Sequence, residues 1–317
     1  MTRGILDRLA DGPVLGDGGY LLELEKRGYV QAGPFTPEVV IEHPDALAQL
    51  HREFLRAGAE VLQTMTFYAS DDKLATVGLA GKVDEINRTA VKVAREVASE
   101  GDALVAGNLS LTWAYQPEDP SSADHVRELF DRQLRDQSDA GPPDFWIGET
   151  FSYLGEALLF VERAKATGRP VMVTMSFEQP VARSYEGDTP ADCARKLSDA
   201  GADIVGVNCL NGPEQQLPIA LEMRSAVGGF VAAQPVAYRT SAEQPISPRR
   251  RASPTSSTPC SCLARRWPST PGPLRRAGST TSARAAGASR RTSARWARRS
   301  GRPRTLNAHG RAPPAAR

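Results

Sequence analysis

Seven short apolar runs, each followed by a longer amphipathic segment, dominate the first three quarters of the chain. The runs lie at residues 13–19, 59–69, 103–110, 144–151, 170–177, 202–209 and 228–238. Between them, apolar residues recur at three- and four-residue steps, which predicts helices over 44–58 and 83–99 and near 152–167, 190–200 and 213–226. The runs are apolar on both faces, as are parallel strands covered by helices. Seven such β-then-α units predict an α/β fold, a (β/α)₈ barrel that is one unit short.

A doubly wound parallel sheet is the alternative that the same alternation allows. It is less favoured because the first run ends in Gly-Asp-Gly-Gly-Tyr (16–20), which does not match the G-x-G-x-x-G turn of a dinucleotide site. The eighth βα unit of a barrel should then lie beyond residue 245.

The composition changes abruptly at that point. Residues 246–317 contain 17 arginines and no lysine, aspartate or glutamate. Removing these 17 from the chain's 39 basic residues leaves 22 against 37 acidic residues in 1–245, a formal charge of −15. A segment rich in Arg, Ser, Pro and Ala cannot bury a core and is predicted to be disordered. The sequence therefore predicts an incomplete barrel over 1–245 and a tail over 246–317.

Composition also bears on where the protein works. No run of about 18 apolar residues is present, so no membrane span is predicted. The first residues lack the apolar centre of a signal peptide. The four cysteines, at positions 193, 209, 260 and 262, are too few for a disulfide scaffold and suit a reducing compartment. We expect a cytoplasmic protein with small-molecule partners and no membrane partner, and its oligomeric state stays open.

The carboxyl ends of the predicted strands carry the polar residues of interest, because those ends face the active site in a (β/α)₈ barrel. They are Asp17-Gly18-Gly19, Thr66-Phe67-Tyr68, Asn108, Glu149-Thr150, Ser176, Asn208-Cys209 and Gln234. A buried carboxylate is costly unless it is paired, so Glu149 should meet a ligand ammonium or an arginine. Asp17 could instead cap a turn, and Tyr68 could be a core residue. Cys193, on a helix, is expected to pack.

Four stretches of the chain resemble one known family. They are "LGDGGYLLELEKRGYVQAGPFTPE" (15–38), "LHREFLRAGAEVLQTMTFYASDDKL" (50–74), "EGDALVAG" (100–107) and "VGVNC" (205–209). Over about residues 4–245 the chain resembles the betaine–homocysteine S-methyltransferases. The resemblance implies a (β/α)₈ barrel that transfers a methyl group from betaine to homocysteine, giving methionine, at a zinc ion held by three cysteines.

The resemblance also implies roles for particular residues. Asp17 with Gly18, and Glu149, match amino-acid-binding positions, and Cys209 matches the first zinc ligand. Bound zinc converts a thiol, whose pKa is near 8.5 when free, into the more nucleophilic thiolate. Carboxylates suit the homocysteine ammonium.

The donor site departs from the family pattern. Quaternary ammonium groups are usually held in an aromatic cage, and Tyr68 matches one aromatic of the family's cage. Phe35 stands where the family has tryptophan, and Thr150 stands where it has tyrosine. Another onium donor, such as a sulfonium compound or S-methylmethionine, therefore stays open beside betaine.

The other two zinc ligands of the family form an adjacent Cys-Cys pair after the eighth strand, and no such pair occurs here. Cys260 and Cys262 have no predicted strand before them and are not expected to be ligands. Read one base out of register, codons for "GSTTSARAAG" (278–287) can encode "VNYIGSCCG", and codons for "SPTSSTP" (253–259) can encode "FPYELDP". We therefore interpret the tail as a frameshift product, equivalent to loss of one base near codons 245–252.

Three functional readings follow. The chain is predicted to be a homocysteine S-methyltransferase whose activity is weak or absent for want of two zinc cysteines. A non-catalytic barrel that binds homocysteine or another ligand is the second reading. An arginine-rich tail that binds nucleic acid is the third, and it is least favoured because it does not explain the missing strand.

Overall fold

The computed structural model describes residues 3–30, 36–178, 181–237 and 262–263. All of these belong to one unit over 1–272, and a second unit, 273–317, lies outside the described residues. The strands are β1 (Val14–Leu15), β2 (Val61–Gln63), β3 (Leu104–Ser110), β4 (Phe145–Phe151), β5 (Val171–Met175), β6 (Ile204–Asn208), β7 (Phe230–Gln234) and β8 (Cys262–Leu263). They form one sheet in the order β1-β8-β7-β6-β5-β4-β3-β2, in which β2 to β7 are parallel.

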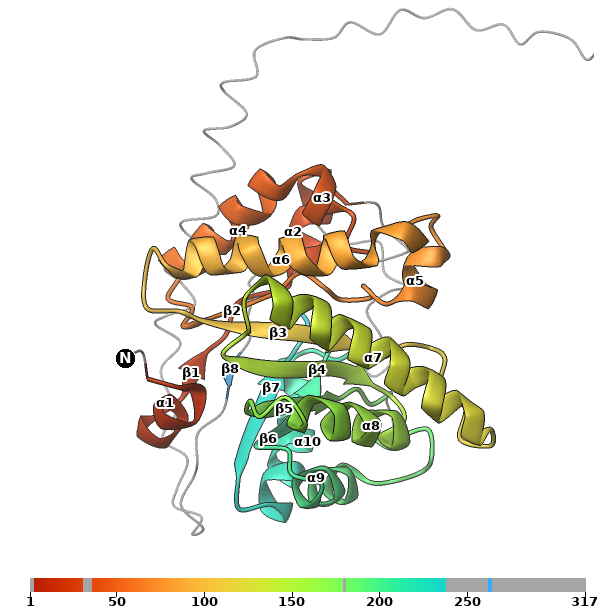
Figure 1. Ribbon diagram of the computed structural model, residues 1–317. Helices are drawn as coiled ribbons and strands as arrows, with labels where there is room; N and C mark the ends of the chain where they lie inside the picture. The colour runs from red at the N-terminus through yellow and green to blue at the C-terminus, as the bar shows by residue number, and fades with distance from the viewer. Residues whose placement is uncertain (1–2, 31–35, 179–180, 238–261, 264–317) are drawn as a thin grey trace, which may run out of the picture. The chain divides into compact units, whose positions relative to one another are not determined.

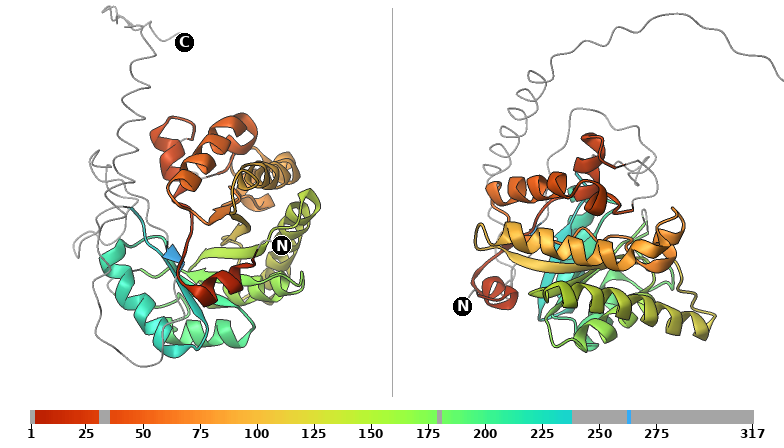
Figure 2. Two further views of the ribbon diagram at one scale, coloured as in Figure 1. Left: turned by 90° about the vertical axis from the view of Figure 1, so that its left-hand side faces the viewer. Right: turned by 45° about the horizontal axis from the view of Figure 1, so that its top comes forward.

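The helices alternate with the strands and cover the outer side of the sheet (Figures 1 and 2). They are α1 (Ile5–Asp11), α2 (Tyr20–Lys26), α3 (Val39–Glu42), α4 (Pro44–Arg56), α5 (Asp71–Ala75), η1 (Ala80–Lys82), α6 (Val83–Ala98), α7 (Pro120–Ala140), α8 (Leu154–Lys165), α9 (Pro190–Asp199) and α10 (Pro213–Ala226). α4 and α6 pack on β2, α8 packs on β4 and β5, and α10 packs on β6 and β7. No described helix is both long and apolar enough to cross a membrane.

The sheet curls until its two end strands meet. The Glu60 amide, just before β2, donates to the Leu15 carbonyl of β1 at 2.8 Å. The Gln63 amide donates to the Asp17 carboxylate at 2.5 Å, so β1 and β2 run in the same direction. The seven predicted strands and the barrel architecture are therefore confirmed.

The eighth position of the ring differs from a regular barrel. β8 is only two residues long, and it runs antiparallel to both β1 and β7. A regular eighth strand is parallel and leads into a helix, and no such unit occurs among the described residues. Cys262, for which no strand was expected, lies in β8 itself. The boundary predicted at 245/246 falls outside the described residues.

The inner face of the sheet changes from apolar to polar along the strand direction. Near the amino ends the interior holds Val14, Val61, Leu104, Ala106, Phe145, Ile147, Met172, Ile204 and Ala232, covered by Ile5 and Leu9 of α1. Alternate residues of a strand share a face, so the same inner rows continue as Gln63, Asn108, Glu149, Thr174, Asn208 and Gln234. The fold thus builds a polar layer at the carboxyl end, above a sealed apolar floor.

Candidate functional site

Two carboxylates from opposite parts of the sequence meet in this polar layer. Gln63 joins them: its backbone amide donates to Asp17 Oδ2 at 2.5 Å, and its side-chain Nε2 donates to Glu149 Oε1 at 2.8 Å. Asp17 is buried just after β1, and Gly18 follows it, half-buried. Sequence reasoning selected Asp17 and Glu149 but missed Gln63, whose signal was an amide inside the apolar run of β2.

Side-chain amides enclose Glu149. Besides Gln63, Asn108 Nδ2 donates to Oε1 at 2.6 Å, and Asn208 Nδ2 donates to Oε2 at 3.1 Å. Burial raises the pKa of Glu149 to about 7, and the bonds from these three amides limit the rise. These three hydrogen bonds favour the ionised form of the carboxylate, whereas its burial disfavours that form more strongly.

Asp17 is held by an aromatic pair. The Tyr20 hydroxyl donates to Asp17 Oδ2, and the same hydroxyl oxygen lies 2.8 Å from His51 Nδ1. Burial raises the pKa of Asp17 to about 7, and the charge of Glu149 adds to the rise. Burial lowers the pKa of His51 to about 3, so its ring is neutral at physiological pH.

Neither carboxylate has an ion-pair partner within the part of the chain that the structure describes. The pKa of each is lowered only by hydrogen bonds to neutral donors, with no positive charge contributing. Two ionised carboxylates so close together are costly without a cation between them. The geometry therefore suits the ammonium group of a ligand.

Cys209 lies at the same end of the sheet, directly after β6. Its backbone is left-handed at φ 58°, as is that of Leu210 at φ 52°. Its amide donates to the Gln234 carbonyl at 3.1 Å, and its carbonyl accepts from Gln216 Nε2 at 2.8 Å. Burial raises the pKa of the Cys209 thiol to about 11, and the nearby Glu149 charge contributes. The free thiol is therefore protonated at neutral pH.

The donor set around Cys209 does not fit zinc. Among the described residues no three His, Cys, Asp or Glu side chains gather as a metal site would need. The buried polar atoms near Cys209 include the amide oxygens of Asn211, Gln216 and Gln234, which have no hydrogen-bond partner in the described part of the chain. Zinc sites use Cys, His or carboxylate ligands, at least three of them from the protein. Cys260 and the side chain of Cys262 lie outside the described residues.

An aromatic pair lies beside the thiol. Tyr68 follows β2 and Trp113 follows β3, and Trp113 Nε1 donates to Tyr68 Oη at 3.0 Å. Burial raises the pKa of Tyr68 to about 12, and the charges of Cys209, Glu156 and Glu149 contribute, which places its ring near the site. Trp113 was missed from the sequence because it lies in the loop just beyond the predicted strand 103–110 and not within it.

Two residues that depart from the family's donor pattern have different outcomes. Thr150 is hydrogen-bonded to Asn208: its amide donates to Oδ1 at 2.9 Å, and its Oγ1 accepts from Nδ2 at 2.7 Å. Thr150 thus helps to fix the amide that contacts Glu149. Phe35 lies outside the described residues.

Backbone strain gathers at this end of the barrel. Among the described residues, the non-glycine residues with positive φ are Tyr68, Trp113, Thr150, Cys209 and Leu210. Each lies at or just after the carboxyl end of a strand. Such conformations cost free energy and persist where the surrounding structure enforces them, commonly at functional sites. Their placement therefore agrees with the polar layer as the candidate site.

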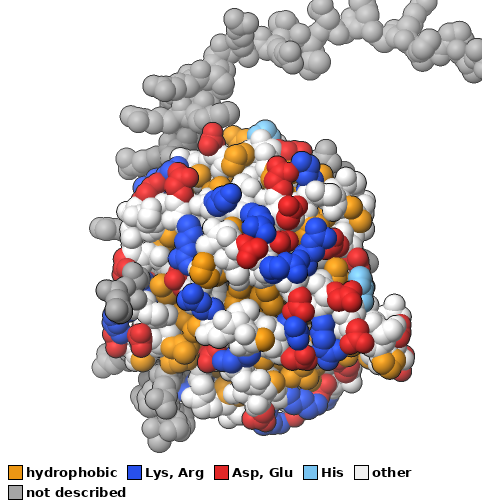
Figure 3. Space-filling model, viewed as in Figure 1, with side chains coloured by type: hydrophobic (Ala, Val, Ile, Leu, Met, Phe, Trp, Pro, Cys, Tyr) orange, Lys and Arg blue, Asp and Glu red, His pale blue; other side chains and the backbone are white. Residues whose placement is uncertain are grey.

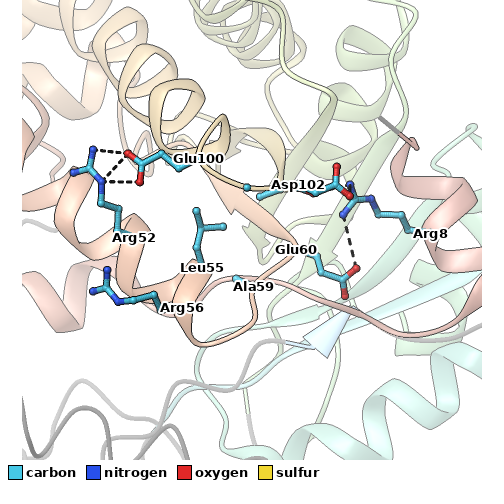
Figure 4. Close-up of a pocket in the computed structure, with 10 residues that line it drawn as sticks. Arg8, Arg52, Leu55, Arg56, Ala59, Glu60, Glu100 and Asp102 are labelled. Carbon is cyan, nitrogen blue, oxygen red and sulfur yellow. Dashed lines mark hydrogen bonds and ion pairs between the residues drawn. The ribbon is translucent and has the colours of Figure 1, made fainter. Parts of the chain in front are cut away.

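One surface hollow lies away from this polar layer. A depression of about 440 Å³ opens at the amino end of β2 and β3 (Figure 4). Its charges pair with one another: Arg52 contacts Glu100 at 2.7 Å, and Arg8 contacts Asp102 at 3.1 Å. Barrel enzymes have their active sites at the opposite end of the strands. We therefore interpret this hollow as a surface depression lined by ion pairs and not as the active site.

Comparison with known proteins decides the family. The homocysteine S-methyltransferase family model matches residues 14–266. The chain belongs to the homocysteine S-methyltransferase family. This confirms the resemblance seen in the motifs that contain Asp17, Tyr68 and Cys209.

Individual relatives agree with this assignment. The chain is 46% identical to betaine–homocysteine S-methyltransferase 1 of Bos taurus over 254 residues, 76% of this chain and 60% of that protein. The corresponding Sus scrofa protein is 46% identical over 75% of this chain and 87% of that protein. The S-methylmethionine–homocysteine S-methyltransferase BHMT2 of Pongo abelii is 45% identical over 75% of this chain and 64% of that protein. The chain therefore spans about three fifths of the Bos taurus relative.

A solved structure supports the fold. The metallated homocysteine methyltransferase MmuM of Escherichia coli superposes with a TM-score of 0.62 at 22% identity, covering 71% of this chain and 84% of that one. The two proteins share the barrel architecture.

Proposed function

We propose that the barrel binds homocysteine, with its ammonium group between Asp17 and Glu149, as the methyl acceptor of a methyltransferase. The observation that carries the proposal is the buried carboxylate pair, which Gln63 joins and no cation neutralises among the described residues. With the ammonium held there, the ligand's sulfur would extend along the carboxyl rim toward Cys209 and Tyr68. The family and its homocysteine-methylating relatives support this choice of ligand.

The reaction that we propose is a displacement at a methyl carbon. The homocysteine sulfur, as the thiolate, attacks a methyl group of an onium donor. A sulfur–carbon bond forms, giving methionine, while the bond from the methyl carbon to the donor's nitrogen or sulfur breaks, and its electron pair stays on that atom, leaving a neutral amine or thioether. For betaine this step leaves dimethylglycine. Asp17, Glu149 and Gln63 bind and orient the acceptor in this scheme.

Zinc dependence belongs to the proposal only for a chain that carries the two missing cysteines. A single thiol, Cys209, cannot hold catalytic zinc, and the neighbouring amides are not zinc ligands. We therefore propose that the chain as written binds homocysteine but turns it over slowly or not at all. In that case the chain as written acts as a barrel that binds its ligand without catalysing a reaction.

The methyl donor is proposed as an onium compound, with betaine first. The relatives named for betaine and for S-methylmethionine are 46% and 45% identical, so overall identity does not separate them. Tyr68 supports an onium group through its ring, whereas Phe35 and Thr150 replace two aromatics of the betaine pattern.

Two further parts of the proposal concern the protein's cellular compartment and its binding partners. We propose a cytoplasmic enzyme, because the described cysteines, Cys193 and Cys209, are free thiols. Nucleic-acid binding would rest on the arginine-rich tail, since positive and negative side chains are interspersed on the face of the molecule shown in Figure 3.

Homocysteine affinity should depend on pH with a defined sign. Asp17 and Glu149 have pKa values of about 7, and the ligand ammonium needs them ionised. Calorimetric titration from about pH 5.5 to about pH 8 should show affinity falling as the pH drops below about 7, by up to about tenfold per pH unit for each carboxylate that must lose a proton.

4-Mercaptobutyrate, which is homocysteine without its amino group, is the matched control ligand. It should bind more weakly than homocysteine at pH 8 and should not lose affinity in acid. Homocysteine affinity that is constant across the range, or stronger in acid, would contradict the proposed carboxylate site.

A further inference from the structure

A cation of the chain itself, the Lys73 ammonium, lies over the Tyr68–Trp113 aromatic pair at the carboxyl end of the barrel. The Lys73 Nζ lies 4.3 Å from the Tyr68 ring centroid and 5.5 Å from that of Trp113. Both distances are within the range of a cation–π contact. The bond from Trp113 Nε1 to Tyr68 Oη holds the two rings as one unit.

The Lys73 ammonium has no carboxylate partner among the described residues. The two acids that precede it are engaged elsewhere: Asp71 pairs with Arg132, and Asp72 pairs with His125 at 2.7 Å. Burial lowers the pKa of Lys73, with no negative charge opposing the shift. The rings are thus the groups that stabilise this ammonium.

The conformation of Trp113 is energetically unfavourable. Its side chain is 61% exposed, and its backbone lies in the left-handed region at φ 64°. An exposed indole in a strained conformation contributes little to a hydrophobic core. It donates a hydrogen bond to Tyr68 and its ring faces the Lys73 ammonium, so its position suits one wall of a cation site.

The location connects this cation site with the acceptor site. The charges of Cys209, Glu156 and Glu149 all raise the pKa of Tyr68, and Lys73 Nζ lies over its ring, so Tyr68 is near both the acceptor site and the Lys73 ammonium. A positively charged methyl donor on the rings would lie beside the acceptor's sulfur. The aromatic pair is open to solvent through Trp113, which gives such a donor a path of entry.

We propose that Trp113 and Tyr68 form the onium subsite of this chain, and that the Lys73 ammonium is a built-in competing cation which the methyl donor displaces. This inference rests on the proposed function for its ligand class. It assigns Trp113 to a wall of the donor site and makes Lys73 a determinant of donor affinity.

Tetramethylammonium is the probe for the test, because it has the onium group and no carboxylate. Calorimetry on the full chain should show that Lys73→Met binds it about three- to tenfold more tightly than the unchanged protein, since a competing cation is gone. Trp113→Ala should weaken binding by a similar factor, and Trp113→Phe should restore most of it. Lys92→Met, at an exposed lysine of α6, is the matched control and should change nothing.

Two results would overturn the proposal. One is tetramethylammonium affinity that does not respond to Lys73→Met and Trp113→Ala, including the case in which no variant binds the probe. The other is betaine binding that weakens in Lys73→Met, which would assign Lys73 to the donor's carboxylate. Homocysteine titrations on the same variants keep the proposed function separate: they should be unchanged, and a protein that fails to bind homocysteine refutes that function whatever the onium result.

Discussion

Restoring the reading frame downstream of codon 245 should convert a chain that binds zinc weakly into one that binds one zinc ion per molecule tightly. The restored segment would supply the strand and adjacent cysteines of "VNYIGSCCG" in place of residues 278–287. Together with Cys209 these make three thiolate ligands, the number that catalytic zinc sites take from the protein. We expect apparent zinc affinity at pH 7 to rise by at least about a thousandfold.

The structure gives a reason to expect the restored segment to fit beside Cys209. The present β8 has two residues and runs antiparallel, between β7 and β1. Next to β7, the side-chain oxygens of Gln234, Gln216 and Asn211 are buried and find no hydrogen-bond partner within residues 3–30, 36–178 and 181–237. A full parallel strand and its following turn would occupy the same position in the ring and bring polar groups to these atoms.

The controls separate the cysteines from the effect of completing the barrel. A restored chain whose two adjacent cysteines are changed to serine should fold like the restored chain and lose the zinc, and Cys209→Ser should do the same. Zinc content by elemental analysis, with competition by a chelator, measures the change. Tight stoichiometric zinc in the chain as written, or none in the restored chain, would contradict the frameshift interpretation.

Glu149→Gln should weaken homocysteine binding by at least about 30-fold. Removing one charge of a buried, hydrogen-bonded ion pair typically costs about 2–5 kcal/mol, and here the ligand's ammonium would be left against a neutral amide. The acid-side loss of affinity should also become shallower, because only Asp17 would still titrate near pH 7.

Glu178→Gln provides the matched control, because Glu178 is an exposed carboxylate after β5 at the same rim. It accepts a bond from the Tyr185 hydroxyl at 2.9 Å, which a glutamine oxygen can also accept. Its homocysteine affinity should be unchanged. Thermal unfolding of both variants shows whether they fold. If Glu149→Gln does not fold, Asp17→Asn provides a second test of the same site. If both variants fold and bind homocysteine as tightly as the unchanged protein, the ligand's ammonium group does not bind between these carboxylates.

Most of the sheet could be predicted from the sequence, because its strands are short apolar runs between recognisable helices. The longest helix, α7, was not predicted. Its 21 residues are mostly polar, and its buried face includes Gln133 and Gln137. Gln137 Nε2 donates to the Asn108 carbonyl at 2.9 Å and to Asn87 Oδ1 at 3.1 Å. The apolar stripe of α7, which includes Val126, Phe130 and Leu134, is short and is shared with these buried amides, so the pattern is weaker than in the predicted helices.

The candidate site could be predicted only where a charged residue or a cysteine stands at the end of an apolar run. Asp17, Glu149 and Cys209 stood out because charges and a thiol interrupted apolar runs. Gln63 did not stand out, because its role depends on donating to two groups that are far apart in the chain. Lys73 lies in α5 and Trp113 lies after β3, so the contact of the Lys73 ammonium with the Trp113 ring exists only once β2 and β3 are side by side.

The most direct test of the whole account compares methionine formation from homocysteine and betaine by two proteins, the chain as written and the chain with its frame restored. The account predicts that both proteins bind homocysteine and that only the restored protein forms methionine at a measurable steady rate. Equal turnover by the chain as written, or failure of both proteins to bind homocysteine, would contradict it.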